Sequence, residues 1–458
     1  MTMLDVINPT TGTLLERVPV DTPDVVERKL AEARSAFDAW RRTSFAERAG
    51  VLRTVAGLMR ERVDDLAPIM TREMGKPIGE GRGEVLKAAW AAEHYAEHAE
   101  GYLAEEHIDS DASRSWVQYL PLGPVLGILP WNAPFWLAFR FCAPALMAGN
   151  TCVMKHDPHT PLSARAIAGL FADAGAPAGV MAHVTVATPA VEALIRDPRI
   201  QAVSFTGSDR AGAIVAGIAA SEIKPAVLEL GGSDPAIVLA DADLEEAARV
   251  ICLSRIINAG QSCIAAKRII VEHAVHDRFA ALLEERLGAL TVGDPLDEGT
   301  DVGPIARDDL RQELHRQVQR TVDQGATVRM GGAVPPGDGF FYPVTMLTEV
   351  TPAMCAAREE TFGPVAVLLR ATDADEALRI ANDTHYGLGA SVWTGTERGV
   401  AMARDLFAGQ VSVNGIVKTD PRLPSGGIRR SGYGRELGPH GIREFVNAQQ
   451  VWVGPAKG

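Results

Sequence analysis

Hydrophobic positions in the first hundred residues recur at helical intervals. Over residues 24–42 the apolar positions Val25, Leu30, Ala33, Phe37 and Trp40 are separated by charged residues. The segments 45–74 and 84–103 show the same spacing, and the second of them is rich in Ala and Glu. Because apolar residues three or four apart lie on one face of a helix, this pattern predicts helices over all three segments.

The pattern changes between residues 117 and 237. Short apolar runs alternate there with helical segments at 163–174 and 191–196; the runs cover 125–129, 151–154, 202–205, 226–230 and 236–239. Strands that alternate with helices at this spacing predict right-handed crossovers and a mostly parallel sheet.

A second alternating region follows, from about residue 244 to 408. Its apolar runs cover 268–271, 327–330, 365–369 and 390–393. We therefore expect two α/β units in sequence with a cleft between them, and a surface loop at the Gly/Pro-rich segment 331–339. The tail, 444–453, predicts a strand after a helical turn near His440. Such an end strand is expected to pair elsewhere, with another subunit as one candidate.

Composition narrows the class of protein. The 458 residues are 47% hydrophobic and 22% charged, a balance typical of globular proteins rather than of disordered chains. The net charge of -13 disfavours binding to nucleic acid and to anionic membranes, because both carry negative charge. We expect a small-molecule substrate, with neither nucleic acid nor membrane as a partner.

The cysteine pattern and the N-terminal residues bear on the compartment. Five scattered cysteines without a C-x-x-C pair argue against a disulfide framework and a thiolate zinc site. Residues 1–9 lack the basic and then apolar character of a signal peptide. The apolar stretch 121–149 contains five prolines and Arg140, a pattern that a membrane-spanning helix rarely accepts. These features predict a soluble cytoplasmic protein.

Two residues are candidates for covalent chemistry. Cys263 ends the run Gly-Gln-Ser-Cys, where a thiol on a loop can act as a nucleophile; the alternative is a small buried hydrophobic residue. Glu229 ends an apolar strand before two glycines, the place where parallel sheets carry active sites. Burial there would give it the raised pKa of a general base, and the alternative is a solvated residue at a strand end.

Two further motifs are candidates for binding groups. Gly207, Ser208 and Gly212 follow a strand and open a helix, where backbone N–H groups can hold a phosphate, although the spacing is not G-x-G-x-x-G. Asn132 could donate its amide N–H to an oxyanion or could instead cap the following helix. The histidine pairs lack the neighbouring ligands of a metal centre, so no metal site is predicted.

Together these motifs resemble the aldehyde dehydrogenase superfamily along essentially the whole chain. The matching segments are PWNAP (130–134), VMK (153–155), FTGS (205–208), LELGG (228–232), GQSC (260–263), EETFGP (359–364) and SGYGRE (431–436). The longer segments LELGGSDP, GQSCIAAKR and RRTSFAER are most similar to the bacterial succinate-semialdehyde dehydrogenase branch.

The resemblance implies a set of roles. Cys263 would attack the aldehyde, Asn132 and the Cys263 backbone N–H would hold the oxyanion, and Glu229 would activate the water that hydrolyses the thioester. Binding of the nicotinamide cofactor would fall to Trp131, Lys155, Gly207, Ser208, Gly212, Leu230, Glu360 and Phe362. The implied activity is NAD(P)-dependent oxidation of an aldehyde to a carboxylic acid, with succinate semialdehyde as the expected substrate.

The implied fold is α/β, with a Rossmann-type cofactor domain, an α/β catalytic domain and a β-strand arm for oligomerisation. We expect the cofactor domain at 1–102 and 122–231, the catalytic domain at 232–435 and the arm at 103–121 and 436–458. Assembly into a homodimer or homotetramer is expected through this arm.

The sequence departs from the family pattern at three positions. Ala133 and Ser425 stand where the family has aromatic residues, so the pocket is wider or more polar and a bulkier or aromatic aldehyde is the alternative substrate. Pro158 stands where NAD-preferring members carry a Glu that would repel a 2′-phosphate. With Lys155 nearby, we expect NADP to be preferred and NAD to be usable. A catalytically silent relative is a further alternative, which the intact Cys263, Glu229 and Asn132 disfavour.

Arg140 is the candidate for binding a charged substrate. It lies in an otherwise apolar run, and burying a lone guanidinium is costly unless an anion or acceptors meet it. In similar enzymes an Arg at this position binds the distal carboxylate of succinate semialdehyde. Arg255, Thr419 and Ser425 are further candidates for the substrate site. The alternative for Arg140 is an internal salt bridge to a buried acid.

Overall fold

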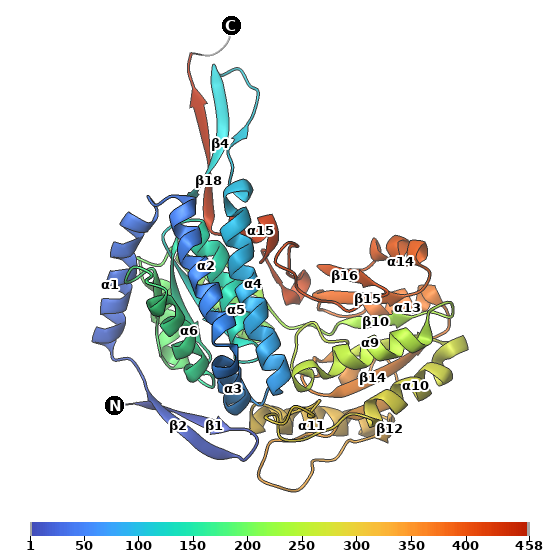
Figure 1. Ribbon diagram of the computed structural model, residues 1–458. Helices are drawn as coiled ribbons and strands as arrows, with labels where there is room; N and C mark the ends of the chain where they lie inside the picture. Colours follow the sequence, from blue (N-terminus) through green and yellow to red (C-terminus); the bar gives the residue numbers. More distant parts are fainter. Residues whose placement is uncertain (1, 456–458) are drawn as a thin grey trace.

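Two large sheets form separate lobes, and a narrow arm projects from one of them (Figure 1). The computed structural model describes residues 2–455. The N-terminal lobe holds a six-stranded sheet and most of the early helices, while the second lobe holds a seven-stranded sheet. The predicted α/β class with two alternating units is confirmed.

The first hundred residues are helical after a short N-terminal hairpin. The hairpin strands are β1 (Met3–Asn8) and β2 (Thr13–Pro19), and the helices are α1 (Pro23–Trp40), α2 (Phe45–Glu61), α3 (Val63–Met74) and α4 (Ile78–Tyr102). Ser44 and Glu47 form a capping box that fixes the start of α2. The single helix predicted over 45–74 is wrong in one respect, because Arg62 leaves helical geometry (φ −104°, ψ 20°) and separates α2 from α3.

The six-stranded sheet has the order β17-β9-β8-β5-β6-β7. All neighbours are parallel except β17, which runs antiparallel to β9. Its strands are β5 (Pro124–Leu129), β6 (Thr151–His156), β7 (Met181–His183), β8 (Ala202–Thr206), β9 (Ala226–Glu229) and β17 (Gly432–Tyr433). The crossover helices are α5 (Pro134–Met147), α6 (Pro161–Asp173), α7 (Val191–Arg196) and α8 (Asp209–Ser221). Candidate residues of the site therefore lie at the carboxyl ends of β6, β8 and β9.

The seven-stranded sheet has the order β12-β13-β14-β11-β10-β15-β16, and only β12 is antiparallel to its neighbour. Its strands are β10 (Pro235–Val238), β11 (Arg268–Glu272), β12 (Thr327–Met330), β13 (Thr345–Val350), β14 (Val365–Ala371), β15 (Gly389–Trp393) and β16 (Gln410–Val413). Its helices are α9 (Leu244–Ile256), α10 (His276–Gly288), α11 (Asp308–Asp323), α12 (Cys355–Arg358), α13 (Ala374–Asn382) and α14 (Thr396–Ala403).

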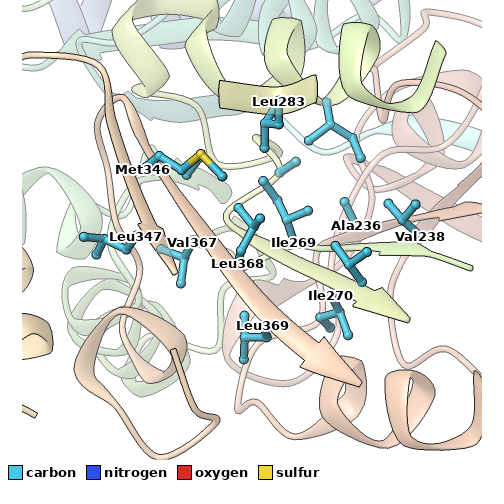
Figure 2. Packing of buried hydrophobic residues seen from close by; sticks show 14 of the residues in the cluster. Ala236, Val238, Ile269, Ile270, Leu283, Met346, Leu347, Val367, Leu368 and Leu369 are labelled. Carbon is cyan, nitrogen blue, oxygen red and sulfur yellow. The ribbon is translucent and has the colours of Figure 1, made fainter. Parts of the chain in front are cut away.

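Continuous apolar runs in the central strands explain why this sheet is buried on both faces. Ile269 and Ile270 of β11 and Leu368 and Leu369 of β14 are at most 1% exposed. Figure 2 shows Ile269 and Leu368 on the side of the sheet that faces Leu283 of α10, and Ile270 and Leu369 on the opposite side. Strands without polar alternation are typical of parallel sheets covered by helices on both sides. This core fixes the position of the loops at the strand ends, which carry the site.

The arm consists of β3 (Glu106–His107), β4 (Arg114–Pro121) and β18 (Val446–Val453), in the order β18-β4-β3. The predicted tail strand is confirmed, as is the preceding helical turn, α15 (Gly438–Arg443). β18 pairs with β4 of its own chain, and no strand within residues 2–455 pairs with its other edge. The predicted arm boundary at residue 458 lies outside the described residues. Oligomerisation through the arm and the proposed domain limits stay predictions.

Candidate active site

The loop that carries Cys263 has an unusual backbone. Asn258, Ala259 and Gly260 all have positive φ values, of 55°, 53° and 75°. Left-handed geometry strains residues other than glycine, so two of these three positions need support from their surroundings. At Gly260 a β-carbon would also collide with the carbonyl group of Gly363. The conformation therefore explains why the motif begins with glycine.

Buried polar groups hold this loop in place. Arg255 Nη2 donates to the carbonyl oxygen of Gly260 at 2.6 Å. Asn258 N donates to Glu80 Oε2 at 2.7 Å, and Lys267 Nζ donates to the carbonyl oxygen of Cys263 at 2.7 Å. Arg255 is fully buried among such carbonyl groups. Its Nη1 and Nη2 atoms bind backbone carbonyl groups beneath the cysteine loop, while Nε has no hydrogen-bond partner among the described residues. Contact of Arg255 with a substrate anion stays a prediction.

Asn132 lies against the cysteine loop. Its side-chain Nδ2 donates to the backbone carbonyl oxygen of Gln261 at 3.1 Å. The backbone carbonyl oxygen of Asn132 accepts from Lys76 Nζ at 3.0 Å and from Asn258 Nδ2 at 2.9 Å. An amide nitrogen carries two hydrogens, so one remains for an oxyanion near Cys263.

The alternative role of Asn132 as a helix cap is not what the structure shows. The N-cap of α5 is Ala133, without a side-chain capping bond. The first N–H groups of α5 are instead accepted by Glu84 Oε1, at 2.9 Å from Phe135 N and 3.1 Å from Trp136 N. Glu84 also forms a buried ion pair with Lys76. The side chain of Asn132 is thus left to face the cysteine loop.

Glu229 is buried at the end of β9, with 4% of its surface exposed, so the alternative of a solvated strand-end residue is wrong. Burial raises the pKa of Glu229 to about 7, although the neighbouring Arg140 opposes that rise. One carboxylate oxygen, Oε2, accepts from Arg140 Nη2 at 3.1 Å, while Oε1 has no hydrogen-bond partner among the described residues. A carboxylate with a raised pKa and a free oxygen is suited to accept a proton near neutral pH.

Burial favours the protonated form of the Cys263 thiol. Burial raises the pKa of Cys263 to about 12, and the positive charges of Lys267 and Arg140 lower it only in part. The residue itself is partly exposed, so a substrate can approach it. The nucleophile therefore has to transfer its proton when it reacts.

Arg140 connects the general-base candidate with a second acid. Its Nε lies 2.6 Å from Glu436 Oε2, and its Nη2 lies 3.1 Å from Glu229 and 3.3 Å from Ser425 Oγ. The internal salt bridge that was the alternative from the sequence is therefore present. Two carboxylates already balance the charge of Arg140, which leaves it without a surplus for a substrate anion.

The turn after β8 has the features of a phosphate cradle. Ser208 is the N-cap of α8 and accepts from Ala211 N at 3.3 Å, and Gly207 N donates to the carbonyl oxygen of Glu229 at 3.0 Å. Gly212 packs directly against Leu230, where a β-carbon would collide. Nearby, at the end of the same strand, Thr206 Oγ1 is buried without a hydrogen-bond partner in the described chain. These residues fit a phosphate at a helix N-terminus.

The remaining candidates for cofactor binding are Lys155 and residues of the second lobe. Lys155 is buried at the end of β6, and no acidic side chain of residues 2–455 pairs with it. Glu360 Oε1 accepts from Gly232 N at 3.1 Å and lies 3.3 Å from Lys267 Nζ. The rings of Phe362 and Trp131 meet at right angles, with centroids 5.8 Å apart. The lobes are thus in contact at this site, and the donor set fits a dinucleotide.

Sequence reasoning missed several charged residues of the site. Glu436 and Lys267 lie within quoted motifs, SGYGRE and GQSCIAAKR, yet no role was inferred for them. Lys87 lies in the Ala- and Glu-rich helix α4, where a lysine looks like an ordinary surface residue. The structure instead directs its Nζ toward Thr419 Oγ1, at 2.9 Å. Lys87 is identified as a site residue only by this tertiary contact between α4 and Thr419.

Two α/β lobes meet at a loop cysteine, an amide and a buried carboxylate, a set of groups typical of thiol-dependent enzymes. Consistent with this class, the aldehyde dehydrogenase family model matches residues 1–451. The chain belongs to this family and is an NAD(P)-dependent aldehyde dehydrogenase.

Individual relatives support this assignment. The chain is 46% identical to a succinate-semialdehyde dehydrogenase [NADP(+)] of Mycobacterium ulcerans over 452 residues, which is 98% of this chain and 99% of that protein. A crystal structure of succinic semialdehyde dehydrogenase from Streptococcus pyogenes, in complex with NADP+, matches with a TM-score of 0.96 at 33% identity, over 98% and 99% of the two chains. An NAD-dependent aldehyde dehydrogenase from Sinorhizobium meliloti matches with a TM-score of 0.96 at 37% identity, over 100% and 92%.

No helix within residues 2–455 is long and apolar enough to cross a membrane.

Proposed function

We propose that this enzyme oxidises succinate semialdehyde to succinate through a cysteine thioester, with NADP as the preferred cofactor. The observation that carries the reaction is the meeting of three groups from distant parts of the chain: the thiol of Cys263, the amide of Asn132 and the buried carboxylate of Glu229. The choice of substrate is supported by the names of full-length relatives at 46% identity.

The groups act in sequence. Cys263 Sγ transfers its proton to water, and the thiolate adds to the aldehyde carbon. Asn132 Nδ2 and the Cys263 backbone N–H donate to the resulting oxyanion. A nicotinamide cofactor, when bound here, would supply the hydride acceptor. When the aldehyde hydrogen leaves as hydride, a thioester to Cys263 remains. Glu229 then removes a proton from water as its oxygen attacks the thioester carbon, and the acid leaves as the thiol is regenerated.

A substrate series tests this function. We expect the reduction of NADP, followed at 340 nm, to show a kcat/KM at least about tenfold higher for succinate semialdehyde than for butanal, because a charge-assisted contact is worth about 1.5–3 kcal/mol. Benzaldehyde represents the aromatic alternative. A higher kcat/KM for benzaldehyde or butanal than for the semialdehyde would refute the proposed substrate, while retaining the reaction.

The cofactor preference depends on Pro158. Pro158 is uncharged, and the adjacent Asp157 is engaged at 2.6 Å by His159 Nδ1. An unpaired buried lysine, Lys155, remains to attract a 2′-phosphate. We expect Pro158→Glu to lower kcat/KM for NADP by about tenfold or more and to spare NAD, since a new carboxylate repels the phosphate. Titration of both cofactors measures this, and a wild-type enzyme that strongly favours NAD would contradict the argument.

A further inference from the structure

Lys87 occupies an unusual place for a lysine. It lies midway along α4, partly exposed, and its Nζ sits 4.2 Å from the centre of the Trp136 ring. The same Nζ donates to Thr419 Oγ1 at 2.9 Å. An aromatic face and a hydroxyl therefore hold the ammonium group in one position, although neither of them neutralises its charge.

The acids around Lys87 are already paired with other groups. Glu84, one turn earlier on α4, is bound by Lys76 and by the first N–H groups of α5. Asp420 is held by Arg422, with contacts of 2.9 and 2.6 Å. Within residues 2–455 no carboxylate forms an ion pair with Lys87. Burial and the nearby Arg140 lower the pKa of Lys87 to about 8, the direction expected for a cation that lacks a counterion.

In contrast to Lys87, Arg140 has more negative charge around it than it carries positive charge. It is held between Glu229 and Glu436, so two negative charges surround one positive charge. Trp136 and Arg140 are four residues apart on α5 and so share one face of that helix. Arg140 interacts electrostatically with both Cys263 and Lys87, so the lysine lies near the catalytic groups.

We propose that Lys87, oriented by Thr419 and Trp136, binds the distal carboxylate of the semialdehyde substrate, and that Arg140 instead positions Glu229. This assignment rests on the proposed function, since it requires a substrate that carries a second, anionic end. An incoming carboxylate supplies the counterion that Lys87 lacks. At Arg140 it would meet two carboxylates of the same charge.

The test compares Lys87→Met with Lys87→Arg on two aldehydes, succinate semialdehyde and butanal. Lys87→Met keeps the length of the side chain and removes the charge. We expect it to raise KM for the semialdehyde by about tenfold or more, with kcat changed less than about twofold and butanal kinetics unchanged. Lys87→Arg should retain most of the semialdehyde affinity. Thr419→Val, which removes the orienting hydroxyl, should raise the same KM by a smaller factor.

Two controls separate the possible failures. Lys29→Met removes a lysine of α1 that pairs with Asp21 at 2.6 Å, away from the site, and should leave both KM values unchanged. Arg140→Leu should lower kcat for both aldehydes equally.

Two outcomes would overturn the assignment. One is an equal loss on both aldehydes in Lys87→Met, and the other is a semialdehyde-specific KM defect in Arg140→Leu but not in Lys87→Met. If Lys87→Met does not fold, an unchanged semialdehyde KM in Thr419→Val overturns it. A wild-type enzyme without preference for the semialdehyde would instead refute the proposed function.

Discussion

Cys263→Ala is expected to abolish aldehyde oxidation, with a loss in kcat of at least about 10⁴-fold, because no other group can form the covalent intermediate. Cofactor binding should survive, since the cradle at Ser208 and the buried Lys155 does not involve the thiol. Steady-state assays measure the first effect, and fluorescence titration with NADPH measures the second.

Cys142→Ala is the matched control for this prediction. Cys142 is fully buried in α5, and burial raises the pKa of its thiol far above the usual range, so it is chemically inert. Its removal should leave kcat within about twofold of the wild-type value. Substantial oxidation by Cys263→Ala would show that the reaction uses a different nucleophile.

The sequence predicted those elements that have a clear hydrophobic period. Apolar runs such as 125–129 and 365–369 became β5 and β14, because central strands of a covered parallel sheet contain few polar residues. Weaker patterns were missed. β16 alternates Gln410 and Ser412 with two valines over only four residues, and the hairpin of β1 and β2 lies on the surface. Short or half-exposed strands bury few side chains, so their sequences lack a clear hydrophobic pattern.

The candidate site divides in the same way. Cys263, Glu229 and Asn132 were identifiable because each lies in a motif at a strand or helix end. The roles of the basic residues Arg140 and Lys87 could not be predicted in this way, because the charge balance around a side chain depends on its tertiary partners. Arg140 and Lys87 illustrate this. The arginine in an apolar run has two acidic partners, whereas the lysine on a polar helix has none in the described part of the chain.

The second large effect concerns Glu229. Glu229→Gln keeps the shape of the side chain and one acceptor for Arg140 but cannot take a proton from water. We expect the first turnover, a burst of NADPH, to survive while steady-state kcat falls by about 10²- to 10⁴-fold, as removal of a general base requires. Stopped-flow absorbance at 340 nm resolves the two phases. Loss of the burst itself would mean that Glu229 accepts the thiol proton of Cys263, which burial holds in place.

The pH profile gives an independent check on the same residue. Because the pKa of Glu229 is raised to about 7, its basic form predominates above that pH and is lost below it. Where thioester hydrolysis limits turnover, kcat should rise with pH up to about 7 and then level off, falling about tenfold for each unit below. The rise should be absent in Glu229→Gln. An ordinary carboxyl, with a pKa of about 4.3, is ionised over the whole range from pH 5.5 to 8. A wild-type kcat that stays constant over this range would therefore show that burial does not raise the pKa of Glu229.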